Sequence, residues 1–324
     1  MSKNFGLGSR SMKKAGIYAL KNAEMAGAIS FQTAADLGQR WGQFCAFSAV
    51  HGVRQMEFVD AALVVEYGKQ LAARVRENIN RPTGENRPCT PLPSISASSA
   101  QNRISAVNTV MTLATKGLWV PVSPTSSKEC TITKRNHIRK IPPTGLDREY
   151  LKRALSALDA RGQAITCLAR ELGLRSKEAS LLDAVSALNE AVKTGAVTIE
   201  HGTKGGRSRT FSLCSDWQLK ALQRAAEVQG IARAVMPAAE DWQSWRQTGL
   251  RRIRETLQEF GIRGIHELRS AYACNRYEQL TGFHAPLLGG KAPPALDRKA
   301  RQQISAVLGH SRVAITNAYL GGQR

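Results

Sequence analysis

The chain has 324 residues, of which 42% are hydrophobic, and carries a formal net charge of +21 with a pI of about 10.2. This length favours two domains and lets the chain bury a full core. The excess positive charge is shared almost equally by residues 1–145 and 146–324, so we expect a polyanionic partner, most simply nucleic acid, gripped by two basic lobes rather than by one basic tail.

Cysteine spacing and hydropathy argue against several other classes of protein. The six cysteines are scattered, without a Cys-x-x-Cys pair or a cysteine–histidine pair at zinc spacing, so we expect reduced core thiols and no metal site. No apolar run approaches the roughly 18 residues of a membrane span. The N-terminus also lacks the apolar core of a signal peptide. These features predict a cytoplasmic protein with no membrane partner.

Four amphipathic helices are expected in residues 1–120. Apolar residues recur at helical spacing over about 11–28, from Thr33 onward, over about 57–78 and over about 96–115. Thr33 and Asp36 resemble a capping box that would start the second helix. Residues 81–93 are rich in proline and are predicted to form a loop. The pattern is typical of a small helical bundle.

Residues 121–145 are predicted to form a linker that ends in a basic run. The prolines and serines at its start favour an irregular segment. A basic run between two basic lobes predicts contact with the DNA backbone, whereas a solvated charge cluster without a partner is the alternative. The candidate DNA contacts in this run are Lys134, Arg135, Arg139 and Lys140.

Residues 146–324 combine helical periodicity with one β signal. Helical spacing begins near Asp147, and Gly173 is expected to end the second helix of this region. Residues 197–200 and 210–213 alternate around a glycine-rich turn, which predicts a hairpin with Lys204 at its tip. Arg207 and Arg209 on the same hairpin are candidate phosphate contacts. We therefore expect a mainly α fold with a small β-sheet.

The remaining residues are predicted to be helical, with one interruption. Helices are expected over 216–235 and 249–260, with two tryptophans packing the connection, and on the segment that places His266 and Arg269 on one face. Residues 280–297 are rich in glycine and proline and are predicted to form an inserted loop. An apolar helix then ends at Gly309, and a further short helical turn carries Tyr319.

Four short motifs occur in an order that resembles the tyrosine recombinase (phage integrase) family. They are Gly-Leu-Arg-Ser-Lys-Glu at 173–178, the hairpin lysine at 204, His-Glu-Leu-Arg at 266–269, and Leu-Gly-His at 308–310 followed by a tyrosine at 319. The likeness covers nearly the whole chain, strongly over 172–178 and 264–320 and weakly over 1–145. Within this family, the chain is similar to integrases of proteobacterial prophages and integrative elements.

The resemblance implies a helical core-binding (SAM-like) domain over 1–120, a basic linker over 121–145 and a catalytic domain over 146–324. The implied activity is site-specific recombination through a 3′-phosphotyrosine, which integrates or excises a mobile element. Glu178 would orient an arginine by pairing with it, without contacting the substrate itself. No metal or other cofactor is implied, because arginines and a lysine would carry the electrostatic role. The implied catalytic residues are Arg175, Lys204, His266, Arg269, His310 and the nucleophile Tyr319.

The family's partners are double-stranded DNA, three further copies of the chain on two DNA sites, and an optional accessory factor that bends DNA or sets direction. The implied location is the bacterial cytoplasm, in association with the nucleoid. Two departures from the family pattern concern geometry: forty residues separate Arg269 from His310, more than the common spacing, and only five follow Tyr319. The short tail puts tail exchange between subunits in doubt.

Two other functions remain open at this stage. A type IB topoisomerase shares the residue set but acts as a monomer that relaxes supercoils, so strand exchange between two DNAs would distinguish it. A non-catalytic or regulatory DNA-binding relative would be expected to lack Arg175, Arg269 or Tyr319, and all three are present.

Overall fold

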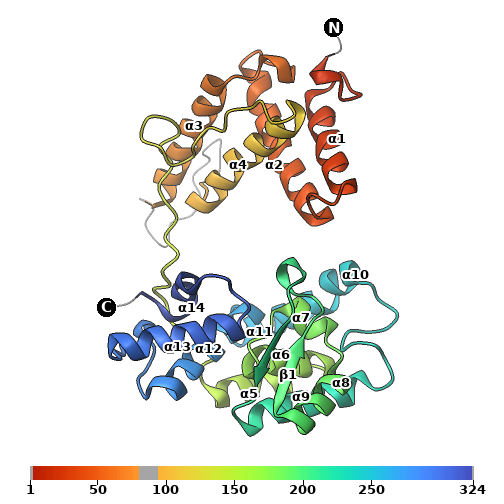
Figure 1. The fold of residues 1–324 in the computed structure, drawn as a ribbon, viewed down its shortest axis with the longest axis vertical. Coiled ribbons are helices and arrows are strands. Elements are labelled where there is room, and N and C mark those ends of the chain that lie inside the picture. Colours follow the sequence, from red (N-terminus) through yellow and green to blue (C-terminus); the bar gives the residue numbers. More distant parts are fainter. Residues whose placement is uncertain (1–2, 80–93, 323–324) are drawn as a thin grey trace. The chain divides into compact units, whose positions relative to one another are not determined.

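The computed structural model describes residues 3–79 and 94–322. The chain divides into two compact units, an N-terminal unit over Met1–Asn136 and a C-terminal unit over His137–Arg324 (Figure 1). The boundary lies within the segment 121–145 that was expected to be a linker. The predicted loop at 81–93 lies outside the described residues.

The N-terminal unit is a bundle of α-helices. Its helices are η1 (Asn4–Gly6), α1 (Met12–Met25), α2 (Phe31–Val50), η2 (Met56–Phe58), α3 (Ala61–Ile79) and α4 (Ala97–Ala114). Trp41 and Phe44 of α2 are completely buried and pack against Ile104 of α4 in one apolar cluster. Burial of each such side chain contributes about 1.5–3 kcal/mol, so packing of the apolar faces accounts for the bundle.

Two features of this unit differ from expectation. The second helix starts earlier than predicted, because the Ser30 side chain accepts a hydrogen bond from the backbone N–H of Thr33 and caps the helix. The expected capping box beginning at Thr33 is therefore wrong. Residues 121–136 also pack on the bundle: Val122 and Ile132 are buried in its core. Half of the expected linker is thus part of a folded unit.

The C-terminal unit is helical with a two-stranded antiparallel sheet. It begins with α5 (Arg148–Ser156), α6 (Ala160–Glu171), α7 (Ser176–Leu181), α8 (Ala184–Thr194), β1 (Ala196–Ile199), η3 (Lys204–Gly206) and β2 (Arg209–Ser212). It continues with α9 (Asp216–Gln229), α10 (Trp242–Gln247), α11 (Gly249–Glu259), α12 (Ile265–Thr281), η4 (Pro286–Leu288), α13 (Pro294–Val307), η5 (Val313–Thr316) and α14 (Asn317–Leu320). The mainly α fold with a small sheet is confirmed.

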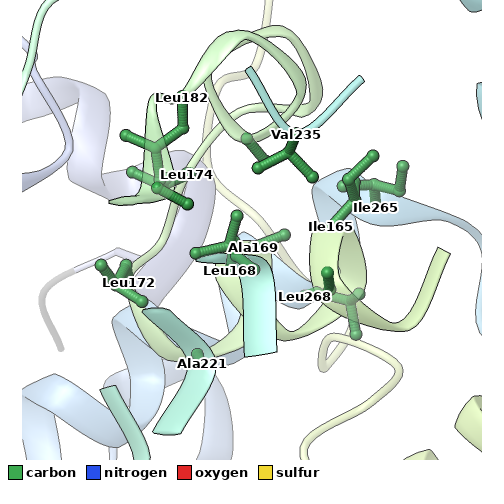
Figure 2. Packing of buried hydrophobic residues seen from close by; sticks show 14 of the residues in the cluster. Ile165, Leu168, Ala169, Leu172, Leu174, Leu182, Ala221, Val235, Ile265 and Leu268 are labelled. Carbon is green, nitrogen blue, oxygen red and sulfur yellow. The ribbon is translucent and has the colours of Figure 1, made fainter. Parts of the chain in front are cut away.

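Helix α6 forms the centre of the main core of this unit. Its residues Ile165, Leu168 and Ala169 are fully buried, and Figure 2 shows them surrounded by apolar side chains from several other elements, including Ala221 of α9 and Leu268 of α12. Because α6 ends at the site described below, this core holds the end of α6 in a fixed position relative to α12.

Three local predictions for this unit are corrected. The helix expected over 216–235 ends at Gln229, because Gly230 leaves the helical conformation and residues 235 and 236 donate backbone hydrogen bonds to Leu182 and Ser180. The two tryptophans lie on the short helix α10 rather than in a connection. The segment 280–297 is no free loop: α12 extends to Thr281, α13 starts at Pro294, and the residues between them include the buried Ala285.

Candidate active site

Arg175 lies at the start of α7, directly after the turn that ends α6. Gly173 in that turn has a φ of +66°, and a Cβ there would lie 2.5 Å from the ring of Tyr272, so only glycine fits. The backbone N–H of Arg175 donates to Oε2 of Glu178 at 2.8 Å, and its Nη1 donates to Oε1 at 2.5 Å. The motif thus turns the Arg175 side chain back onto Glu178.

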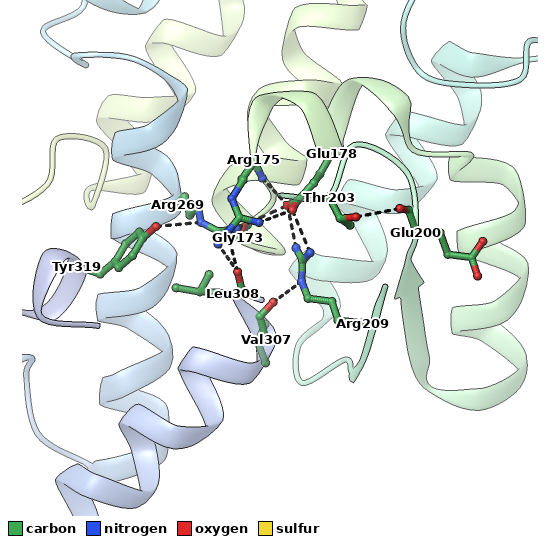
Figure 3. A network of polar contacts seen from close by, with 10 residues as sticks. All are labelled: Gly173, Arg175, Glu178, Glu200, Thr203, Arg209, Arg269, Val307, Leu308 and Tyr319. Atoms are coloured by element: carbon green, nitrogen blue, oxygen red, sulfur yellow. Dashed lines mark hydrogen bonds and ion pairs between the residues drawn. The ribbon is translucent and has the colours of Figure 1, made fainter. Parts of the chain in front are cut away.

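Glu178 is the centre of a cluster of three guanidinium groups (Figure 3). Its side chain is fully buried, and besides Arg175 it accepts hydrogen bonds from Arg209 at 3.0 and 2.8 Å. The third guanidinium, of Arg269, lies 3.7 Å away. Burial alone would raise the pKa of Glu178, but the hydrogen bonds and charges of Arg209 and Arg175 lower it to about 2. Glu178 is therefore a permanent anion.

Arg269 is completely buried on α12 and connects three parts of the unit. It donates to the backbone carbonyl of Gly173 at the end of α6 and to that of Leu308 at the end of α13. Its Nε donates to the hydroxyl of Tyr319 at 3.4 Å. Burial lowers the pKa of Arg269, and the adjacent Glu178 carboxylate compensates its charge.

Tyr319 lies on α14 between two histidines. Its side chain is only 4% exposed, and its ring centroid lies 5.6 Å from that of His266 and 5.5 Å from that of His310. Burial and the charges of Arg269 and Arg175 lower the pKa of His310 to about 4. Desolvation and the charge of Arg269 also lower the pKa of His266, although its side chain is exposed at the surface. Both imidazoles are thus neutral at pH 7.

His310 carries an unsatisfied polar atom. Its Nε2 is buried and has no hydrogen-bond partner, one of two such side-chain atoms found among the residues that the structure describes. A buried polar atom without a partner costs about 1–3 kcal/mol, so its retention beside two arginines is typical of a site built for a ligand. An anion would fit the arginines and accept a hydrogen bond from Nε2–H.

The structure therefore brings five of the six predicted catalytic residues together and leaves the sixth at the surface. Lys204 lies at the exposed tip of the β1–β2 hairpin, where its side chain makes no hydrogen bond or ion pair with any described residue. The hairpin is anchored at its base: a Cβ on Gly202 would lie 2.7 Å from the carbonyl oxygen of Lys177, next to the buried Glu178.

Three of the six predicted DNA contacts bind other residues of the protein. Arg209 is 9% exposed and binds Glu178 and the carbonyl of Val307. Arg139 is 14% exposed and binds Glu267 at 2.6 Å and Ser270 at 3.1 Å. Arg135 binds the side chains of two α4 residues. The other three predicted contacts are exposed, namely Lys134, Lys140 and Arg207.

Two residues that the sequence patterns do not single out hold the segment carrying Tyr319. Arg301 and Asp297 of α13 are 2% and 4% exposed and form an ion pair with an Nε–Oδ1 distance of 2.9 Å. Their four-residue spacing on a helix was an available signal. Nothing in the sequence pattern, however, indicated that both would be buried.

Within 3–79 and 94–322, no three histidine, cysteine, aspartate or glutamate side chains gather as they would around a metal ion. In the same ranges, none of the helices has both the length and the apolar character needed to cross a membrane.

Comparison with known proteins finds one family model and several solved structures. The family model described as integrase matches residues 134–275, whereas no curated protein matches. Among solved structures, lambda integrase bound to DNA has a TM-score of 0.56 at 14% identity, with 97% of each chain covered. The Tn1549 transposon integrase in complex with a circular intermediate DNA has a TM-score of 0.56 at 11% identity, covering 96% of this chain and 95% of that one.

A lambda integrase tetramer bound to a Holliday junction has a TM-score of 0.51 at 16% identity, covering 91% of this chain and 74% of that one. At these identities the solved structures establish the fold. The integrase match includes Arg175, Glu178, Lys204, His266 and Arg269. Residues 134–275 thus match the integrase family model, and the solved integrases share the fold, in agreement with the resemblance to tyrosine recombinases.

Proposed function

We propose that the chain is a site-specific DNA recombinase that cleaves and rejoins DNA through a 3′-phosphotyrosine intermediate and so integrates or excises a mobile element. The observation that carries the proposal is the gathering of two arginines and a histidine near Tyr319. Arg269 donates to the Tyr319 hydroxyl and shares Glu178 with Arg175, and the His310 ring lies 5.5 Å from the Tyr319 ring. A phenol needs such surroundings because it is a weak nucleophile at its ordinary pKa near ~10.

The arginines supply the charge that the reaction requires. A phosphate under attack passes through a pentacoordinate state with extra negative charge, which two planar guanidinium groups stabilise by paired hydrogen bonds. Glu178 holds Arg175 at 2.5 Å and lies 3.7 Å from Arg269, so both forks are fixed before DNA arrives. The free Nε2–H of His310 adds a donor to the same phosphate.

The remaining residues move protons. The oxygen of Tyr319 attacks the phosphorus, the bond to the 5′-oxygen breaks, and the protein becomes linked to the 3′-phosphate. The tyrosine proton passes to His266, whose lowered pKa keeps it neutral and able to accept. Lys204 gives a proton to the leaving 5′-oxygen. In religation to a partner strand each step runs backward, so the phosphodiester energy is conserved.

The site of the free chain is closed. Tyr319 is 4% exposed and Arg269 is fully buried, with every guanidinium nitrogen already donating to the protein. A DNA phosphate therefore displaces the Tyr319 hydroxyl from Arg269 as it enters. Such closure withholds the nucleophile from water until DNA is bound.

The partners follow from charge and fold. A formal charge of +21 suits contact with duplex DNA, and the exposed side chains of Lys134, Lys140 and Arg207 are the proposed contacts to its backbone. Because a lambda integrase tetramer has been solved on a Holliday junction, the proposed assembly is a homotetramer on two sites. The motif likeness favours a proteobacterial prophage or integrative element as its source, with action in the cytoplasm at the nucleoid.

The test is covalent trapping. Nicked duplexes carrying the ends of the element in which the gene lies are incubated with the chain in EDTA, and a protein–DNA adduct is sought on a denaturing gel. The matched variant is Tyr319→Phe, which removes one oxygen. We expect an adduct with the wild type and none with the variant, followed by exchange of strands between two duplexes.

Each other outcome contradicts part of the proposal. DNA binding without an adduct in either protein would indicate a non-catalytic relative. If the chain forms the adduct and relaxes supercoiled DNA but never exchanges strands, it would be a topoisomerase. An adduct that survives Tyr319→Phe would assign the nucleophile to another tyrosine, with Tyr272 or Tyr277 of α12 as the next candidates.

A further inference from the structure

The segment that carries Tyr319 is clasped at both ends by one buried side chain. Nη1 of Arg301 donates to Oγ1 of Thr316 at 3.3 Å and to Oδ1 of Asn317 at 2.9 Å, just before the tyrosine. Nη2 donates to the carbonyl of Gly321 at 3.1 Å, just after it. The guanidinium thus bridges the start and the end of α14, which is a single turn of helix.

Arg301 is itself held from behind. Its Nε lies 2.9 and 3.0 Å from the two carboxylate oxygens of Asp297, and the hydroxyl of Tyr277 donates to Oδ1 of that carboxylate at 2.8 Å. Tyr277 is fully buried on α12, seven residues beyond Ser270 and on the helix that also carries Arg269. The chain of contacts therefore runs from α12 through α13 to the nucleophile segment.

We propose that Arg301, held in place by Asp297 and Tyr277, is a positioning residue. It keeps the nucleophile Tyr319 of this recombinase aligned with the phosphate clamp, by which we mean Arg175 and Arg269. The inference rests on the proposed function and deepens it. A four-residue helix has no stability of its own, so α14 needs an external brace. A misplacement of about 1 Å in a reacting atom costs about 10²-fold in rate. A clasp on both sides of Tyr319 prevents that displacement.

The geometry assigns Arg301 a role distinct from the arginines of the phosphate clamp. Each of its guanidinium nitrogens donates to Asp297, Thr316, Asn317 or Gly321, and it forms no hydrogen bond or ion pair with Glu178 or Arg269. Lysine cannot replace it, because one ammonium cannot span three acceptors and a carboxylate in a plane. We therefore expect substitution of Arg301 to slow only those reactions in which Tyr319 takes part.

The experiment compares two reactions of the full-length chain. In the first, Tyr319 cleaves nicked duplex DNA and the rate of adduct formation is measured. In the second, a strand ending in a 3′-(4-nitrophenyl) phosphate is joined to a 5′-hydroxyl end in the Tyr319→Phe background. There the 5′-oxygen attacks phosphorus, nitrophenolate leaves, and the proton of the hydroxyl passes to Lys204, so the clamp is used and the tyrosine is not.

We expect Arg301→Lys to slow adduct formation about 10²-fold and to change the joining rate less than about threefold. Arg298→Met is the matched control, because Arg298 lies exposed on the same helix, and it should leave both rates unchanged. Arg269→Lys should slow both reactions. If Arg301→Lys fails to fold, the double variant Thr316→Val with Asn317→Ala replaces it. This variant removes two acceptors of Arg301 and keeps the buried ion pair with Asp297.

Three outcomes would overturn the inference. They are an equal loss of rate in both reactions, adduct formation at the wild-type rate, and adduct formation faster than wild type, which would make the clasp a brake. Failure of the proposed function is distinguishable, because the wild-type chain itself would then form no adduct.

Discussion

The Glu178 cluster and the tip of the β1–β2 hairpin lie on one stretch of chain, yet the charges of the cluster are largely buried and paired, whereas those of the tip are exposed. Arg209 at the start of β2 is 9% exposed and donates to Glu178 and to the carbonyl of Val307. Lys204, five residues earlier, is exposed and its side chain binds nothing in the described residues.

The difference follows from the cost of burying charge. A guanidinium taken out of water must find a counter-charge and acceptors in the protein, so the arginines around Glu178 are paired before any ligand arrives. A lysine on a solvated turn has no such requirement. The cluster is thus fixed before any ligand arrives, whereas under the proposed function the tip acquires its role only when DNA lies against it.

The largest expected effect comes from removing the anion at the centre of the cluster. Glu178→Gln leaves three guanidinium groups without their carboxylate, and we expect a loss of about 3–5 kcal/mol in the free energy of unfolding, measured by urea denaturation. The matched control is Glu171→Gln, since Glu171 pairs with the 38% exposed Arg148 and should cost about 1 kcal/mol or less. Equal losses in the two variants would refute the preorganised cluster.

A smaller effect, on chemistry alone, is expected at the tip. Lys204→Ala should slow adduct formation about 10²-fold as the loss of a general acid, while stability stays within about 0.5 kcal/mol of wild type. A substrate with sulfur in place of the leaving 5′-oxygen needs no proton and should restore the rate. Arg207→Ala, at the same exposed tip, should weaken DNA binding without this pattern of rescue. Failure of the sulfur substrate to restore Lys204→Ala would remove Lys204 as the acid.

The smallest effects distinguish paired from free cations in the basic run. Lys140→Ala should reduce the slope of log affinity against log salt by about 1, because one phosphate contact is lost, and should leave stability unchanged. Arg139→Ala should leave that slope unchanged and cost about 1–3 kcal/mol in stability, since Arg139 binds Glu267 and Ser270. Salt titrations of DNA binding and urea denaturation of both variants give the answer. If Arg139→Ala, and not Lys140→Ala, reduced the salt slope, then Arg139 would leave Glu267 and bind DNA.

Local patterns in the sequence were enough for much of the fold and for the residue types of the site. Helical spacing located most helices of the C-terminal unit, and alternation around glycines located the hairpin to within one residue of its strands. The motif order picked out Arg175, Arg269, His310 and Tyr319, which the structure brings together. These features depend on neighbours in the chain, so a single sequence contains them.

Pairings between distant segments could be decided only by the tertiary structure. Arg207 and Arg209 are two residues apart on one hairpin, yet Arg209 turns inward because Glu178, 31 residues earlier, lies beneath it on α7. Asp297 and Arg301 show the spacing of a surface ion pair, but the fold buries them against the segment of Tyr319. The sequence by itself determined which side chains could do the chemistry. The packing of α12, α13 and α14 decided which charges are buried and paired, because that depends on counter-charges far along the chain.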